Sequence, residues 1–411
     1  MPSERPILIA GGGPVGLVTA LALAQQGFEV RVFEAERRID DSPRAATTHA
    51  ATLEMLEGLG LVEEVTRRGL IEPRFRVWDR ASHEIIAEFD FGILKSDTRF
   101  PYVVQCEQHK LAALALERLR ALPNAAVTFA ARVTGLAQDD LGVTAEVETS
   151  DGARRVLGAY LIGADGGRST VRKALGIEFE GYTHPERFLV LSTPEALGAE
   201  FAECSRNYFS DPDEWAALFK VTGDDGRGLW RVVFPARPNE SDEQAFAENM
   251  VQARLQRFFP KSGAYRVVHR NIYHVHQRVA ASFRRGRVFL VGDAAHVNNP
   301  LGGLGLNFGI HDGVDLCGLL ARVARKDAAA SILDEYDRFR RPLNVEYVQQ
   351  QTIANKKRLE EKDPAIRAKN HAALRATAAD PAAHRAYLLK ASLLESVRNR
   401  NAGECAGATP R

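Results

Sequence analysis

The sequence predicts an α/β protein with a second, mixed-sheet domain and a helical C-terminal part. Three observations support this prediction. An apolar strand near the N-terminus runs into a glycine-rich turn and a helix, residues 178–285 are rich in aromatic residues and alternate like strands, and the pattern becomes helical after about residue 332. With 411 residues the chain exceeds what one core usually organises, so more than one domain is expected.

The N-terminal stretch ILIAGGGPVG, residues 7–16, contains Gly11, Gly13 and Gly16. In a dinucleotide-binding turn the first glycine permits the tight turn, the second lets the backbone approach a pyrophosphate, and the third lets the next helix pack close to its strand. A helix from about Pro14 to Gln26 would point the positive end of its dipole at the phosphates. A plain glycine-rich turn is the alternative.

The strand that follows favours the dinucleotide-binding turn over the plain glycine-rich turn. Residues 29–34 (EVRVFE) end in Glu34, 18 residues after Gly16, where a carboxylate can accept hydrogen bonds from a ribose hydroxyl. We therefore predict a Rossmann-type dinucleotide-binding domain. Arg44, in the polar segment 37–48, is either a solvated arginine or a second contact to the pyrophosphate, because guanidinium binds phosphate oxygens bidentately.

The next part of the sequence predicts a series of helices and strands. They are a helix at about 49–59 ended by Gly60, a strand pair at 75–91, a helix at 107–119, strands at 125–138 and 142–149, and a strand at 155–162. The last strand leads into GADGGRSTVR, residues 163–172, where Asp165 and Gly166 precede a new helix. This stretch is either a turn or a second backbone-rich site for polyol or phosphate oxygens.

A third glycine-rich stretch covers residues 287–320. A buried strand ends at Gly292 and Asp293, and a loop from Asn298 to Gly305 leads into a helix. A loop that lies flat against a ligand explains so many glycines beside one acid. The residues between the second and third stretches, 178–285, are expected to form a sheet domain that covers the cofactor.

Composition excludes several classes of partner. The net charge is +1, so no basic field suggests nucleic acid or an anionic membrane. The four cysteines show no metal-type spacing and are expected to be free thiols in a reducing compartment. We expect no membrane span and no signal peptide, and hence a cytoplasmic protein. His274 and His276 share a strand face without a third ligand, so no metal site is expected.

With these three stretches, the sequence resembles the single-component FAD-dependent aromatic hydroxylases, which include para-hydroxybenzoate hydroxylase and phenol hydroxylase. The resemblance covers about the first 345 residues. It implies that NADPH or NADH reduces FAD, that O2 gives a flavin C4a-hydroperoxide, and that a small aromatic (phenolic or heteroaromatic) substrate is hydroxylated. The resemblance also implies that Asp165 and Gly166 serve FAD and, in passing, the nicotinamide cofactor, for which this family has no separate binding fold.

The resemblance also implies individual roles. Glu34 would bind the adenosine ribose, Arg44 and Gln108 the pyrophosphate and ribityl region, with Gln105 as a competitor of Gln108, and Asp293 the ribityl chain. The residues implied to bind FAD are Gly11, Gly13, Pro14, Val15, Gly16, Glu34, Ala35, Arg44, Gln108, Val133, Asp165, Gly166, Gly292, Asp293, Pro300, Gly303, Leu304, Gly305, Leu306 and Asn307.

Candidates for the reaction itself are fewer. A base that deprotonates a phenol makes its ring more nucleophilic. His49 and Tyr208 are the candidates for a side chain near the flavin, each with a structural alternative, and Pro300 is expected beside the reacting ring. His296 is expected to support its loop.

The sequence departs from the family at a few positions. Asn299-Pro300 stands where many members have two prolines, and Leu306 where they have Met. Family substrate residues do not map onto 185–285, so the substrate stays open. The rivals are an isoprenoid-type flavin reductase and a non-catalytic flavin redox sensor. A halogenase is disfavoured because no Trp-x-Trp pair occurs.

Together these features predict a division of the chain. The expected parts are FAD-binding segments at 1–75, 101–180 and 286–345, a substrate-domain hairpin at 76–100, a substrate-binding sheet domain at 181–285, C-terminal helices at 346–400 and a disordered tail at 401–411. Either a monomer or a homodimer is compatible with the sequence, and the C-terminal helices could wrap the substrate domain or form a dimer seam.

Overall fold

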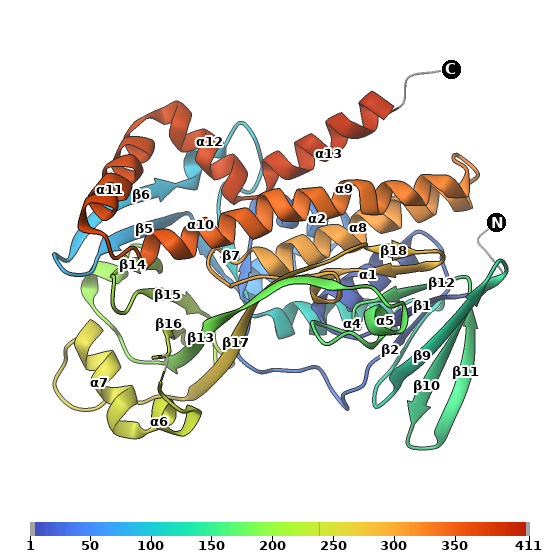
Figure 1. The fold of residues 1–411 in the computed structure, drawn as a ribbon, viewed down its shortest axis with the longest axis horizontal. Helices are drawn as coiled ribbons and strands as arrows, with labels where there is room; N and C mark the ends of the chain where they lie inside the picture. The colour runs from blue at the N-terminus through green and yellow to red at the C-terminus, as the bar shows by residue number, and fades with distance from the viewer. Residues whose placement is uncertain (1–4, 238, 408–411) are drawn as a thin grey trace.

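The computed structural model describes residues 5–237 and 239–407, and two large sheets organise it (Figure 1). The first sheet contains the N-terminal strand and is parallel except for one short edge strand. Its order is β18 (Arg284–Arg285), β19 (Val288–Leu290), β12 (Tyr160–Gly163), β1 (Ile7–Ala10), β2 (Val30–Phe33) and β8 (Ala125–Thr128). The predicted α/β fold is confirmed.

The helices that cover this sheet explain its apolar strands. All of β1 is buried, as is expected for a parallel strand covered on both faces. The helix α1 (Pro14–Gln25) follows it and is buried from Gly16 to Ala24, because it packs against both α4 (Gln108–Arg120) and α8 (Leu304–Ala324). A helix that is apolar on every side, such as ALALA in α1, belongs inside a protein.

The second sheet has eight strands from three distant parts of the chain. Its order is β20 (His296–Val297), β17 (His269–Ala280), β13 (Phe179–Thr193), β16 (Leu229–Pro235), β15 (Ala216–Val221), β14 (Arg206–Ser210), β5 (Arg74–Asp79) and β6 (Glu84–Asp90). The early hairpin β5–β6 thus joins the later strands, through a parallel pairing of β14 with β5. Aromatic side chains and the helices α6 (Asp242–Phe246) and α7 (Glu248–Phe258) cover its outer end.

Two smaller sheets complete the fold. One is β3 (Thr47–Thr48), β7 (Val103–Gln105) and β4 (Leu70–Glu72), and the other is β11 (Gly152–Gly158), β10 (Gly142–Thr149) and β9 (Arg132–Asp139). The single strands predicted at 125–138 and 155–162 are wrong. Each is divided between two sheets, the first at Ala130, whose φ of +52° turns the chain.

The C-terminal helices lie partly over the second sheet and partly along α8 and the first sheet (Figure 1). They are α9 (Asp334–Asn344), the π-helix η5 (Val345–Gln349), α10 (Gln350–Leu359), α11 (Pro364–Ala379), α12 (Pro381–Ala391) and α13 (Leu394–Gly407). Because α11 packs on β6 and α10 lies beside β14, these helices cover the sheet within one chain. The disordered tail predicted at 401–411 is wrong for 401–407, which continue α13, and residues 408–411 lie outside the described part.

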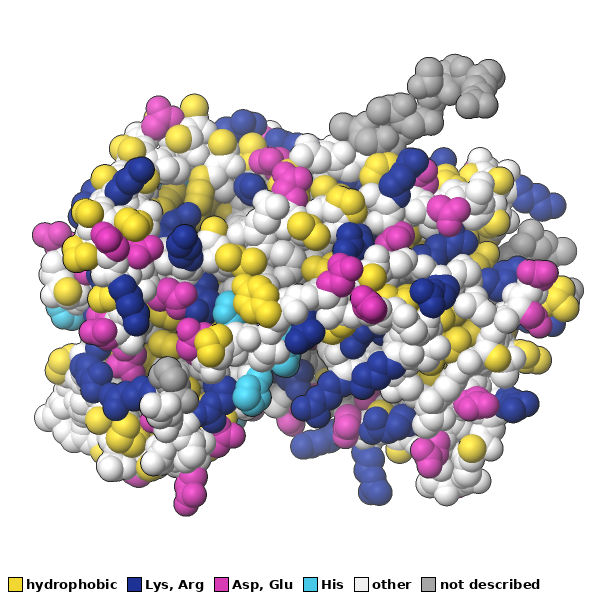
Figure 2. All heavy atoms as spheres, viewed as in Figure 1, with side chains coloured by type: hydrophobic (Ala, Val, Ile, Leu, Met, Phe, Trp, Pro, Cys, Tyr) yellow, Lys and Arg dark blue, Asp and Glu magenta, His cyan; other side chains and the backbone are white. Residues whose placement is uncertain are grey.

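The surface carries no dominant charge. Figure 2 shows basic and acidic side chains interspersed over one face, as a net charge of +1 leads one to expect. None of the helices in the described residues has the length and apolar character needed to cross a bilayer. Cys106, Cys204 and Cys317 are buried free thiols, and the side chain of Cys405 lies outside the described part.

Glycines bring α8 unusually close to α1 and to the turn at Gly292. A Cβ on Gly309 would lie 2.8 Å from Val15 Cγ2 and 2.9 Å from the Gly292 Cα, and a Cβ on Gly313 would lie 2.0 Å from Thr19 Oγ1. A Cβ atom at either glycine would overlap these neighbouring atoms, so the backbone would have to move to make room for it. These glycines therefore fix the distance between the first and the third glycine-rich stretches.

We expect Gly309→Ala to lower the free energy of unfolding by about 1–3 kcal/mol, the usual cost of overpacking. Gly318 on the same helix is the matched control, because a Cβ there meets no atom within 4 Å. Gly318→Ala should raise the free energy of unfolding by roughly 0.5–1 kcal/mol, since it removes a glycine from a helix interior. Urea unfolding measures both, and equal effects of the two variants would contradict the packing argument.

Candidate functional site

The three glycines of the first turn have different surroundings. Gly11 has φ +106°, and a Cβ there would lie 2.3 Å from the Ala164 carbonyl oxygen, whereas a Cβ on Gly16 would lie 2.1 Å from the Gly11 carbonyl oxygen. A Cβ on Gly13 meets nothing within 4 Å. Gly11 and Gly16 therefore serve packing, while Gly13 leaves space for a ligand in front of the turn.

The N-terminus of α1 faces this space. Pro14 is its first residue, and among the described residues no side chain caps its first turn. Its free N–H groups, with the positive end of the helix dipole, form an anion-binding site. Val15 turns away and packs against Gly292.

Glu34 lies at the end of β2, next to the glycine turn. Its Oε2 accepts a hydrogen bond of 2.5 Å from Gly12 N, and its Oε1 accepts one of 2.8 Å from Glu36 N. It opens onto a broad cleft of about 1120 Å³ that also includes Ala35 and Arg44. This is the position of a carboxylate that binds ribose, so the cleft suits the adenosine end of a dinucleotide.

Arg44 stands on the rim of that cleft. Its side chain is 58% exposed and forms an ion pair of 3.2 Å with Asp40. An exposed ion pair of this kind is weak, so a phosphate can replace the carboxylate. Gln108 is half-buried at the start of α4, where its backbone N–H donates to the Ala45 carbonyl next to Arg44.

Other predicted cofactor residues have mainly structural contacts. Val133 is buried in the core, so only its backbone could face a cofactor. Gln105 is fully buried and accepts a hydrogen bond of 2.9 Å from Thr47. The Asp165 carboxylate accepts hydrogen bonds from the backbone of Thr170 and Val171 and so caps α5 (Thr170–Ala174). A Cβ on Gly166, with φ +77°, would meet no atom within 4 Å.

The Gly292-Asp293 turn connects β19 of the first sheet to β20 of the second. Gly292 has φ +57° and packs on Val15. Asp293 is exposed, yet the surrounding protein raises the pKa of its carboxyl, while positive charge on His296 and Arg44 opposes this rise. An accessible carboxylate at this turn is suited to bind hydroxyl groups of a polyol chain.

The loop before α8 is held by one side chain. Asn307 donates from Nδ2 to the carbonyls of Thr47 and Gly303, at 2.8 and 2.6 Å, and its Oδ1 accepts from His49 N at 2.8 Å. Its amide is therefore fully used, and Asn307 positions the loop while any cofactor contact falls to its backbone. Leu304 and Leu306 begin the helix and are buried, and Pro300 is exposed in the preceding turn.

Close packing also fixes the two glycines around the start of α8. A Cβ on Gly303 would lie 2.9 Å from Thr47 Cβ, and one on Gly305 would lie 2.8 Å from Asn298 Oδ1. Gly303 in addition has the positive φ of +71°. These close contacts and the positive φ of Gly303 hold the loop in one conformation at the start of α8.

A second, smaller cavity of about 50 Å³ begins at Gly302. It lies between β5, β14 and the C-terminal helices, and most of its wall is apolar. The lining residues are Phe75, Val77, Arg206, Tyr208, Leu301, Gly302, Gln351, Asn355, Arg358, Leu359, Tyr387 and Ala391. Tyr208 lines this cavity, and its hydroxyl accepts a hydrogen bond of 3.0 Å from Arg206.

His49 lies behind this cavity. It is buried, and its Nε2–H donates a hydrogen bond of 2.8 Å to the Gly302 carbonyl, which fixes the tautomer. Burial and the nearby positive charge of Arg206 lower the pKa of His49 to about 3. The hypothesis that His49 is a general base therefore needs correction: with so low a pKa it is a poor proton acceptor, and it positions Gly302.

Sequence reasoning missed Arg206 and the lining contributed by the C-terminal helices. Arg206 and Tyr208 lie two residues apart on β14 and so share one face with Ser210. This spacing would have linked Arg206 to the candidate Tyr208. No local pattern could place Tyr387 or Leu359 beside residues more than a hundred positions earlier.

Among the described residues, no group of three or more His, Cys, Asp or Glu is arranged to hold a metal. His276 instead bonds Thr183 through Nδ1 at 2.9 Å. His296, expected to be structural, is fully buried and lies 2.7 Å from an Asp312 carboxylate oxygen.

Comparison with known proteins decides the family. A family model described as an FAD binding domain matches residues 4–351. The chain belongs to this family. It is 37% identical to para-nitrophenol 4-monooxygenase of Pseudomonas sp. (strain WBC-3), over 95% of this chain and 96% of that protein.

Two further relatives agree. The chain is 34% identical to 6-hydroxy-3-succinoylpyridine 3-monooxygenase of Pseudomonas putida (strain DSM 28022 / S16), over 89% of this chain and 91% of the relative. The crystal structure of a p-nitrophenol 4-monooxygenase from Pseudomonas putida DLL-E4 superposes with a TM-score of 0.88, at 34% identity, covering 95% and 99% of the two chains. The resemblance to FAD-dependent aromatic hydroxylases is confirmed, and the chain is an enzyme of this group.

The residues present fit FAD. The open space at Gly13 and the uncapped N-terminus of α1 suit the phosphates of FAD, Glu34 suits its ribose, and the exposed Asp293 suits its ribityl hydroxyls. When it is bound there, FAD supplies the redox chemistry and the oxygen transfer, and the chain supplies position, charge and shelter from water.

The Gly13 space gives a direct test. Gly13 has φ −70°, which alanine adopts freely, so Gly13→Ala should leave the FAD-free protein stable to within about 0.5 kcal/mol. The added methyl group occupies the phosphate space, so the Kd for FAD should rise at least about tenfold, or ~1.4 kcal/mol. Flavin fluorescence on titration measures the Kd, and thermal unfolding measures stability.

Gly16→Ala is the control for this test, because its Cβ would clash with the Gly11 carbonyl. We expect it to destabilise the FAD-free protein by roughly 1–3 kcal/mol. An unchanged Kd in Gly13→Ala would show that the dinucleotide lies elsewhere.

Buried histidines make stability depend on pH. Burial, chiefly, lowers the pKa of His311, like that of His49, to about 3. Below about pH 6.5 the unfolded chain binds these protons and the folded chain does not. The free energy of unfolding should therefore fall as the pH falls from 6.5 toward 3, by up to about 1.4 kcal/mol per pH unit for each histidine.

Urea unfolding of His311→Asn between pH 7.5 and 5.5 tests this. In the variant, the free energy of unfolding should depend less steeply on pH, by the contribution of one histidine, whatever its absolute stability. His83→Asn, at an exposed turn position with φ +56°, is the control and should keep the wild-type slope. The same slope in all three proteins would contradict the assignment.

Proposed function

We propose that this enzyme uses FAD, NADPH or NADH, and O2 to hydroxylate a small phenolic or heteroaromatic ring. One observation carries the proposal: the apolar cavity begins at Gly302, in the loop that leads into α8 and that holds Pro300 and Gly303, two of the residues expected to bind FAD. The relatives that share nearly the whole chain are, by name, monooxygenases of a nitrophenol and of a hydroxypyridine. A ring in the cavity would lie against the flavin side of this loop.

The cavity supports a ring-sized substrate. It is small, and its walls include Phe75, Val77, Leu301 and Tyr387, which suit an aromatic ring and exclude water. Keeping water out protects an oxygen-transfer step from wasteful decay. A small cavity of this kind also disfavours the isoprenoid-reductase alternative, which needs a long apolar tunnel.

Arg206 is the group we assign to activation of a phenol. Its guanidinium lies at the cofactor end of the cavity, since its Nη2 donates to the Gly302 carbonyl at 3.2 Å. A fixed positive charge lowers the pKa of a bound phenol and so makes its ring carbons more nucleophilic. Tyr208, which accepts a hydrogen bond from Arg206, would orient the same oxygen.

Several finer points belong to this proposal. Asp165 and Gly166 would be met by FAD and, in passing, by the nicotinamide cofactor, and Pro300 would border the reacting ring. The segments 1–75, 101–180 and 286–345 would bind FAD, with 76–100 and 181–285 covering the substrate. We propose a cytoplasmic enzyme that works as a monomer or a homodimer.

The purified yellow protein should oxidise NADPH or NADH slowly under air and many-fold faster with a suitable phenol. A hydroxylated product should form with little hydrogen peroxide, because the cavity excludes water. Oxidation of the nicotinamide, product and peroxide are measured together over a panel of phenols and hydroxypyridines.

The same panel distinguishes the alternatives. Flavin whose reduction no ring compound accelerates would contradict the hydroxylase proposal and favour a redox sensor. Acceleration with peroxide alone, across the whole panel, would also count against it.

A further inference from the structure

The substrate cavity carries an excess of positive charge. Arg206 and Arg358 both line it, and no Asp or Glu is among the described residues of its wall. Arg206 is only 5% exposed, and its Nη1 has no hydrogen-bond partner in the described part of the chain. A buried charge without a counter-ion is costly, so a ligand is expected to supply the anion.

Arg358 adds a second guanidinium from α10. No hydrogen bond or ion pair joins it to any described residue. Its neighbour Lys356 differs, because Glu186 and Glu360 neutralise that ammonium at 3.3 and 2.5 Å. Two carboxylates therefore neutralise Lys356, whereas Arg358 lines the cavity without one.

The two arginines are anchored near opposite ends of β14. At one end of β14, Arg206 bonds the Gly302 carbonyl. At the other end, Ser210 and Asp211 donate to the carbonyl of Leu359, next to Arg358, at 3.4 and 3.0 Å. Ser210 follows Arg206 by four positions, so the two backbone positions lie about 13 Å apart.

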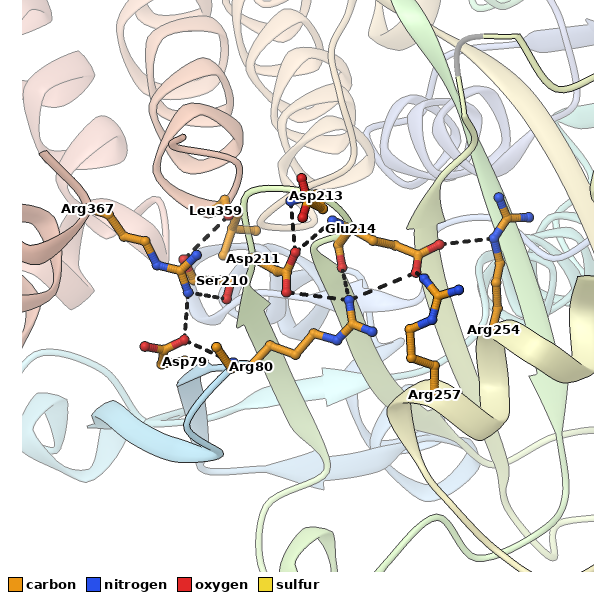
Figure 3. A network of polar contacts seen from close by, with 11 residues as sticks. Asp79, Arg80, Ser210, Asp211, Asp213, Glu214, Arg254, Arg257, Leu359 and Arg367 are labelled. Atoms are coloured by element: carbon orange, nitrogen blue, oxygen red, sulfur yellow. Dashed lines mark hydrogen bonds and ion pairs between the residues drawn. The ribbon is translucent and has the colours of Figure 1, made fainter. Parts of the chain in front are cut away.

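A network of charged groups fixes the far end (Figure 3). Arg367 on α11 donates to Asp79 at 2.6 Å and to the Ser210 carbonyl at 2.9 Å. Arg80 and Glu214 continue the network toward Arg254 on α7. The end of α10 is thereby tied to β5 and β14, so Arg358 is presented from a rigid element.

We propose that the substrates are phenols carrying a second, anionic group, a carboxylate, and that Arg358 is the specificity-determining residue that binds it. The ring would lie between the apolar walls, with its hydroxyl at Arg206 and its carboxylate at Arg358. A planar guanidinium binds a carboxylate bidentately, which an amide of the same shape cannot match. This inference rests on the proposed function and narrows its substrate class.

The test compares acids with their uncharged amides on the FAD-loaded enzyme. The pairs are 4-hydroxybenzoate with 4-hydroxybenzamide, and 3-(4-hydroxyphenyl)propionate with its amide, so that two ring-to-carboxylate lengths are covered. Perturbation of the flavin absorbance gives each Kd. In wild type, at least one acid should bind tenfold or more tightly than its amide.

Arg358→Gln should raise the Kd of that acid at least tenfold and leave the amide within twofold. Lys357→Gln is the matched control, because Lys357 is an exposed cation on the same helix outside the cavity wall. It should change neither Kd. Arg358→Lys should recover part of the preference, since it keeps the charge but loses the bidentate geometry.

Two results would overturn the inference. One is a wild type that binds acid and amide equally in both pairs, and the other is an Arg358→Gln variant that weakens acid and amide alike. If uncharged phenols are hydroxylated well while either result holds, the inference fails and the proposed function stands. If no phenol stimulates nicotinamide oxidation, the proposed function itself fails.

Discussion

One buried carboxylate, that of Asp312, holds the functional part of the molecule together. It is fully buried in α8 and accepts hydrogen bonds from Gly292 N at 3.0 Å, His296 Nε2 at 2.7 Å and Arg340 Nε at 2.8 Å. Burial alone would raise the pKa of Asp312, but Arg340 and His296 lower it, so the group stays ionised. Removing any partner would leave a buried charge poorly compensated.

This arrangement fixes the three glycine-rich stretches relative to one another. Asp312 holds the Gly292-Asp293 turn against α8, and the glycines of α8 hold that helix against α1. At the start of the same helix, Asn307 ties its loop to Thr47 and His49. The dinucleotide turn, the inner carboxylate and the Gly302 loop are thus parts of one rigid unit, to which the second sheet adds the substrate cavity.

The sequence was informative where local backbone demands select the residue. Gly11 needs a positive φ, Gly16 and Gly292 need a missing Cβ, and Glu34 follows at a fixed spacing, so these residues could be placed from the chain alone. The hydrophobic pattern could also distinguish the two large sheets. Strands of the parallel first sheet are continuous apolar runs, whereas several strands of the second sheet alternate between apolar and polar residues.

What could not be predicted depends on tertiary contacts. His49 was a fair candidate for a base by residue type, yet burial beside Arg206 makes it a neutral donor to Gly302. The C-terminal helices carry no motif, and only the folded chain brings Arg358 and Tyr387 to the wall of the cavity. The tail at 401–407 was assigned to disorder from its position, whereas it continues a helix.

A crystal structure of the enzyme with FAD and a bound phenol tests the central claim most directly, that the cavity at Gly302 holds the ring beside the flavin. The account predicts the pyrophosphate at Gly13 and the N-terminus of α1, with the phenol ring between Tyr208, Phe75 and Leu301 next to the flavin. A phenol bound outside this cavity, or a flavin ring remote from Gly302, would contradict it.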